Sequence, residues 1–194
     1  MEYRSFSRYI IYLALFLTAL CSLPSTVCAL SVEKIVFTDS VTIGGRPVPL
    51  RNAAPLHYMN VIKVYVAALY LPEGVTADTV LSDVPKRLEL QYLIAIKGSD
   101  FGKGAEPTLE QNLTPSELAR LRGRIDRLNA TYRDVTPGER YALTYLPGRG
   151  TELALNGTPL TVIEGADFAA AYFGIWLGRT PYSQKLKREL LKGR

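Results

Sequence analysis

Residues 61–71 read VIKVYVAALYL, and this stretch decides the fold. The run is almost continuously apolar and rich in β-branched and aromatic residues, and Pro72 and Gly74 follow it. An apolar run of this length could also be a buried helix, but its composition and its closing residues favour a strand. We therefore predict a central strand that is covered on both faces.

The segments around this strand have the patterns of an antiparallel sheet. On its N-terminal side, residues 41–43 and 46–48 flank Gly44-Gly45, a pair that can adopt the positive φ angles of a two-residue hairpin turn. On its C-terminal side, residues 87–96 begin with strict alternation of polar and apolar residues, which predicts a strand with one solvated face at its start. The remaining strands are predicted at 141–146, 151–155 and 160–163, with a hairpin turn at Asn156-Gly157.

Helical patterns separate and follow these strands. Thr114-Pro115-Ser116-Glu117 combines a capping residue, a first-turn proline and a glutamate, and apolar residues then recur at helical spacing up to Tyr132. Residues 167–177 predict a second helix, with aromatic residues every four positions and Gly178 at its end, and residues 183–192 predict a short basic helix. This order of elements predicts an α+β domain with an antiparallel sheet.

The N-terminus has the features of a secretory signal peptide. Arg4 and Arg8 precede an apolar run at 9–23, and a segment of mostly small residues ends at Ala29. The alternative is an uncleaved membrane anchor, but the run is short for a membrane span and Pro24 follows it directly. We expect residues 1–29 to be the signal and residues 30–194 to form one periplasmic or secreted domain. Contact with a membrane is expected only through an uncleaved signal.

The composition excludes several classes of function. The 194 residues are 47% hydrophobic and 21% charged, as in an ordinary globular protein. A net charge of +5 is too small to indicate a nucleic-acid partner. Cys21 and Cys28 both precede the predicted cleavage point, and His57 is the single histidine. We therefore expect no thiol chemistry, no metal site and no cofactor.

The central strand carries the most specific candidate site. Because side chains alternate along a strand, Lys63 and Tyr65 share one face with Ala67 and Leu69. A lysine and a tyrosine on an otherwise apolar face suit the acidic head of an amphiphile at one end of an apolar cleft. The open alternative is that Lys63 lies at an exposed strand start and that the Tyr65 hydroxyl bonds locally.

Several motifs resemble the bacterial chalcone isomerase-like proteins. Residues 63–72 (KVYVAALYLP) resemble the family's signature strand. Further motifs match the family in the same order along the chain, at residues 37–41, 145–148, 164–168 and 174–178. Together they extend over about residues 32–190. The resemblance implies an open-faced β-sandwich in which helices cover a large antiparallel sheet, with a ligand cleft between the two layers.

The resemblance also implies two functions and a set of site residues. Plant chalcone isomerases are intramolecular lyases that use an arginine, whereas related non-catalytic proteins bind fatty acids with that arginine and a tyrosine. The matched positions are Tyr65 for the carboxylate-binding tyrosine, His57 for the arginine, Phe101 for the catalytic tyrosine, Ile175 for a small polar residue and Asn112 near an active-site asparagine. In addition, Gly102, Gly104 and Pro107 are expected to weaken the helix that relatives carry before Asn112.

These departures favour binding over catalysis. Each donor lost from a developing oxyanion costs about 2.7–4 kcal/mol of barrier, and histidine and phenylalanine replace two of the family's donors here. We expect a non-catalytic protein that binds a fatty acid or similar amphiphile through Tyr65, helped by His57, Lys63 or a nearby arginine such as Arg46 or Arg51. The alternatives are an intramolecular lyase with an unknown substrate, and a protein-interaction module that uses the arginine-bearing helix at 115–133.

Overall fold

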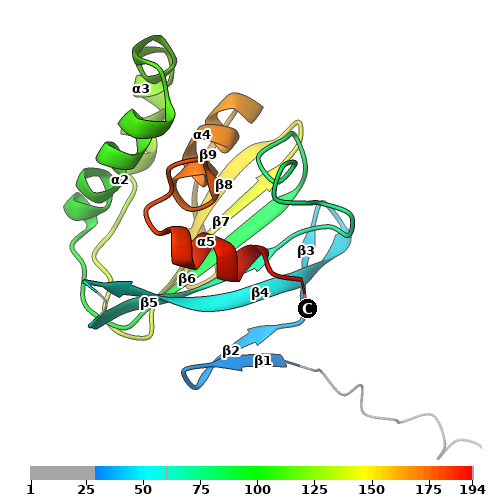
Figure 1. Cartoon of the computed structure of the whole chain (residues 1–194). Coiled ribbons are helices and arrows are strands. Elements are labelled where there is room, and N and C mark those ends of the chain that lie inside the picture. The colour runs from blue at the N-terminus through cyan, green and yellow to red at the C-terminus, as the bar shows by residue number, and fades with distance from the viewer. Residues whose placement is uncertain (1–28, 60, 194) are drawn as a thin grey trace, which may run out of the picture.

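The computed structural model describes residues 29–59 and 61–193. Its main element is a seven-stranded, wholly antiparallel sheet whose strands follow one another in sequence order (Figure 1). The strands are β3 (Ser40–Ile43), β4 (Arg46–Tyr58), β5 (Ile62–Tyr70), β6 (Lys86–Tyr92), β7 (Arg140–Leu146), β8 (Gly150–Leu155) and β9 (Thr158–Ile163). The helices are α2 (Gly98–Asn112), α3 (Pro115–Asn129), α4 (Ala166–Leu177) and α5 (Gln184–Leu191). The predicted α+β architecture, a large antiparallel sheet covered by helices, is confirmed.

The predicted central strand is β5, which pairs with β4 on one side and β6 on the other. Both of its faces are buried. Tyr65, Ala67 and Leu69 join the core beneath the helices, whereas Val66, Ala68 and Tyr70 join a second core on the opposite face. This two-sided burial explains why the strand is apolar throughout.

A two-stranded hairpin, β1 (Ala29–Val32) and β2 (Ile35–Thr38), lies against this opposite face (Figure 1). Its turn consists of Glu33 and Lys34, both with positive φ, and such residues give no turn signal in the sequence. The predicted hairpin at Gly44-Gly45 is confirmed, with φ values of 58° and 78° at the two glycines.

The predicted solvated face of residues 87–96 is wrong. The strand ends at Tyr92, and Glu89 is only 5% exposed. Its carboxylate pairs with Arg87 and Arg140, both at 2.9 Å. The Arg140 guanidinium also lies 4.4 Å from the ring centroid of Phe37, on β2. The face is polar because it holds an ion-pair network beneath the hairpin.

The helices follow their sequence signals, with one exception. Thr114 and Glu117 form the predicted capping box of α3, and α4 and α5 lie where they were predicted. The weak helix expected before Asn112 is instead a fifteen-residue helix, α2, with Pro107 inside it. Gly102 allows α2 to pack closely against α3, since a Cβ at this position would lie 2.7 Å from Nδ2 of Asn129. Tertiary packing therefore overrides a poor local helix propensity.

The predicted signal peptide lies outside the described residues except for Ala29, the first residue of β1. In the part of the chain that the structure describes, no helix is long and apolar enough to cross a membrane.

Candidate functional site

A cavity of about 150 Å³ lies between the sheet and the helices. Strands β4 to β8 supply its floor, α2 and α4 supply its walls, and residues from the segments after β6, α3 and α4 complete it. The lining is almost wholly aliphatic and aromatic, and includes Leu56, Leu88, Leu90, Leu143, Leu153 and Ile96. Such a site can enclose an apolar group.

The cavity reaches the surface beside α2. Three of its lining residues are exposed: Asp100 and Gly104 on α2, and Tyr182 before α5. Four more are partly exposed: Val64, Ile96, Phe101 and Tyr132. Tyr182 is 47% exposed. The exposed residues mark the mouth, which lies beside α2.

Aromatic rings form one wall. Phe101 stacks on Tyr132 at a centroid distance of 4.6 Å. The same phenylalanine contacts Tyr92 and Tyr141 edge-on, at 5.6 and 5.4 Å. Tyr92 in turn contacts Tyr65 at 5.7 Å. Edge-on and offset contacts of this kind stabilise an aromatic cluster beyond simple burial.

The hydroxyl groups of this cluster differ in their bonding. The Tyr65 oxygen accepts a hydrogen bond from Nε1 of Trp176 at 2.9 Å. The Tyr132 and Tyr172 hydroxyls lie 3.0 Å apart. Tyr141 bonds both backbone groups of Arg133. No hydrogen bond joins the Tyr92 hydroxyl to any residue that the structure describes, although the side chain is buried.

Four tyrosines of the cavity, Tyr65, Tyr92, Tyr132 and Tyr172, are neutral at physiological pH. Burial is the main cause that raises the pKa of Tyr65 and Tyr172, and it raises those of Tyr92 and Tyr132 well above the usual value. Each of these hydroxyls therefore keeps its proton and can donate it.

Asp100 is the one charged group among the described lining residues. It is exposed and pairs with Lys103 at 2.9 Å, and this partner lowers the pKa of its carboxyl. The mouth therefore carries a carboxylate whose charge a lysine balances, while the interior is uncharged.

A comparison with protein families assigns nearly all of the described residues to one family. The chalcone isomerase-like family model matches residues 29–192. The chain belongs to the chalcone isomerase-like family.

Solved structures agree with this assignment at the level of the fold. A crystal structure of a fatty-acid binding protein of Arabidopsis thaliana superposes with a TM-score of 0.61 at 15% sequence identity. The match covers 84% of this chain and 96% of that protein. No curated protein sequence matches the chain.

The structure brings together three of the six site residues predicted for this chalcone isomerase-like protein. Tyr65, Phe101 and Ile175 all line the cavity. Tyr65 comes from the central strand, Phe101 from α2 and Ile175 from α4. Their roles in ligand binding stay predictions.

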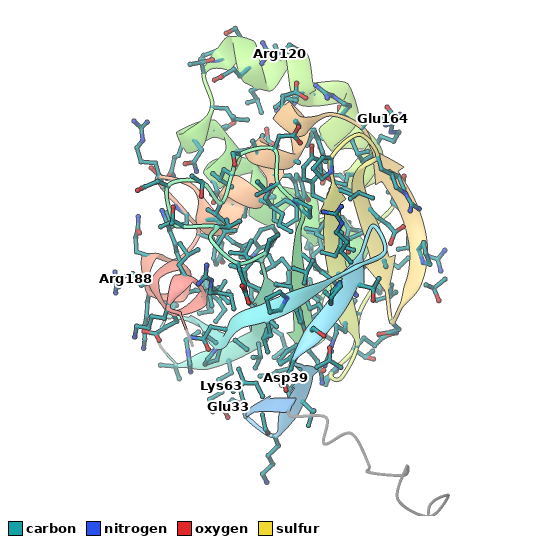
Figure 2. All side chains as sticks on the ribbon, turned by 90° about the vertical axis from the view of Figure 1, so that its right-hand side faces the viewer. Glu33, Asp39, Lys63, Arg120, Glu164 and Arg188 are labelled. Carbon is teal, nitrogen blue, oxygen red and sulfur yellow. The ribbon has the colours of Figure 1, made fainter. Side chains whose placement is uncertain are left out.

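Lys63 and His57 lie elsewhere. The Lys63 ammonium pairs with Glu33 of the β1–β2 turn at 2.7 Å, and the two residues lie together at the far end of the molecule from Arg120 on α3 (Figure 2). Lys63, and to a smaller degree His57, lower the pKa of the Glu33 carboxyl. Neither residue is part of the cavity lining.

Asn112, outside the cavity, joins α2 to the segment that follows α4. Its amide nitrogen donates to the carbonyls of Thr108 and Thr180 at 2.8 and 2.6 Å, and its oxygen accepts from the Thr180 amide at 2.9 Å. It lines a separate hollow between α2, α3 and α4. Arg51 donates to the Val75 carbonyl, and neither Arg51 nor Arg46 lines the cavity.

Sequence reasoning missed several tyrosines of this site. Tyr92, Tyr132 and Tyr172 line the cavity, although none of them was among the predicted site residues. The available signal was that Tyr92 alternates in phase with Leu88 and Leu90, so that its polar tip had to enter the interior. Among the described residues, no group of three or more histidine, cysteine, aspartate or glutamate side chains is placed to hold a metal ion.

Proposed function

We propose that this protein is an exported, non-catalytic binding protein that holds a fatty acid or a similar amphiphile in the cavity beneath α2 and α4. One observation carries the proposal: an apolar cavity with a few hydroxyl groups opens to the surface in a domain of this family. Apolar walls with a few convergent polar groups are typical of small-molecule sites.

The fold comparison supports the same class of ligand. The Arabidopsis thaliana protein is a fatty-acid binding protein, and nearly its whole length superposes on this chain. A shared fold alone does not carry a function, so the chemistry of the cavity has to support it. Here the aliphatic lining provides a place for a hydrocarbon chain.

The same chemistry disfavours the lyase alternative. An intramolecular lyase has to stabilise an oxyanion, and preorganised donors or cations contribute most to that. Phe101 occupies the position that the resemblance assigns to a catalytic tyrosine, and His57 lies with Glu33. If the purified protein converts any of several chalcones to a flavanone, the result would favour the lyase over our proposal.

The proposal is tested with protein purified from the periplasm of its own source. Native mass spectrometry should detect a bound lipid-like molecule, and calorimetry should measure binding of medium-chain fatty acids or their neutral analogues. Protein that is recovered empty and binds none of these compounds would contradict it. The mass of the purified chain also tests cleavage after Ala29.

A further inference from the structure

We propose that the cavity selects an uncharged ligand, bound through a carbonyl oxygen to the hydroxyls of Tyr92 and Tyr65. This inference rests on the proposed binding function and specifies the class of ligand. It excludes the ionised carboxylate as the bound form.

The first argument is the charge of the lining. None of the described lining residues is a lysine, an arginine or a histidine. Lys103, on α2 beside the mouth, already pairs with Asp100. An anion in the cavity would lose its hydration without gaining a cation, and this cost is large.

The second argument is the charge at the mouth. Asp100 lines the entrance, and its lowered pKa keeps it ionised near neutral pH. Lys103 pairs with Asp100, so the mouth offers an incoming carboxylate no unbalanced positive charge.

The third argument is the pattern of unused donors. The Tyr92 hydroxyl has no hydrogen-bond partner among the described residues, and it is not one of the fully enclosed unpartnered atoms, so it is accessible to a ligand in the cavity that it lines. The Tyr65 oxygen accepts from Trp176, which leaves its own proton free to donate. The rings of Tyr65 and Tyr92 are in edge-on contact at 5.7 Å, so the two residues are neighbours in the cavity lining.

The volume limits the ligand further. The cavity measures about 150 Å³, and an engineered apolar cavity of about that size in another protein takes up benzene. A compact body of about six to eight carbon atoms is therefore the expected size, and a longer chain has to extend through the mouth.

The test compares 2-octanone with octanoic acid by calorimetry at pH 6 and pH 8. The ketone should bind with the same affinity at both pH values. If only its protonated form binds, octanoic acid should bind about 100-fold more weakly at pH 8 than at pH 6. Asp100 ionises below this range, and Tyr65, Tyr92, Tyr132 and Tyr172 ionise above it.

Variants test the assigned donors. Tyr92→Phe should weaken binding of the ketone about three- to tenfold and leave thermal stability equal or higher, because it removes an unpartnered hydroxyl. Tyr65→Phe should weaken binding and also lower stability, because the Trp176 N–H loses its acceptor. Tyr58→Phe, at an exposed position outside the cavity, serves as the matched control and should change neither property.

The outcomes separate the two proposals. If neither compound binds, the proposed function fails. If octanoate binds at pH 8 as tightly as at pH 6, the function stands and the selection for an uncharged ligand is wrong. If Tyr92→Phe binds the ketone as well as the wild type does, the carbonyl is not held by Tyr92.

Discussion

Single side chains decide between the alternatives that the sequence leaves open. The Tyr65 hydroxyl accepts a hydrogen bond from Trp176 on α4, and the residue lines the cavity at the same time. Lys63 lies at the exposed start of the strand and pairs with Glu33. The two residues that share a strand face in the sequence pattern therefore serve different parts of the molecule.

Lys86 is a second side chain whose environment matters. The residue is fully buried, its ammonium donates to the Ser82 carbonyl at 2.8 Å, and it lies 4.6 Å from the ring centroid of Tyr145. Burial lowers its pKa to about 8. The unfolded chain keeps this proton up to the usual lysine pKa, so it binds more protons than the folded protein between about pH 8 and pH 10.5.

Stability should therefore rise with pH through this window because of Lys86. Urea unfolding of the wild type and of Lys86→Met at pH 7 and pH 10 measures the effect. The free energy of unfolding of the wild type should gain about 2 kcal/mol relative to the variant between these pH values. A difference that does not change with pH would mean that Lys86 titrates normally.

At the scale of elements, the connection from α4 to α5 is held by α2. Asn112, near the end of α2, makes two hydrogen bonds to the backbone of Thr180. Gly178 ends α4 as predicted, but its φ is −70°, so it is not there for a left-handed conformation. A Cβ at Gly178 would lie 2.9 Å from the Asn112 oxygen, so the glycine provides space for this contact.

Asn112→Ala should lower the free energy of unfolding by about 2 kcal/mol, because it leaves the Thr180 backbone groups without these bonds. It should also weaken ligand binding, since Tyr182 at the mouth follows Thr180 by two residues. Chemical unfolding and calorimetry measure the two effects. Gln111→Ala, at an exposed neighbouring position of the same helix, is the control and should leave both values unchanged.

At the scale of the whole molecule, the sheet has two covered faces. Helices cover the face with the cavity, while the β1–β2 hairpin and an ion-pair network cover part of the other. Arg140 joins these layers, since it pairs with Glu89 on β6, bonds the Val36 carbonyl and lies over Phe37. The hairpin is thus held by charge as well as by apolar contact.

Glu89→Ala should lower the free energy of unfolding by about 3 kcal/mol, because two partly buried arginines lose their shared partner. Glu106→Ala removes a more exposed ion pair with Arg122 and should cost less than about 1 kcal/mol. Denaturant unfolding of both variants makes the comparison. Equal losses would show that burial does not distinguish the two ion pairs.

The sequence by itself determined the strands of the large sheet, two of its hairpin turns, the cap of α3 and the antiparallel class of the sheet. These features depend on near neighbours: Gly44-Gly45 permits its turn, and Thr114 caps its own helix. The tertiary structure alone decided that Tyr65, Phe101 and Ile175 meet while Lys63, His57 and Asn112 do not. It also decided that Glu89 is buried and that α2 persists through Pro107. Partners distant in sequence supply the burial, charge and packing on which these outcomes depend, and no local pattern contains them.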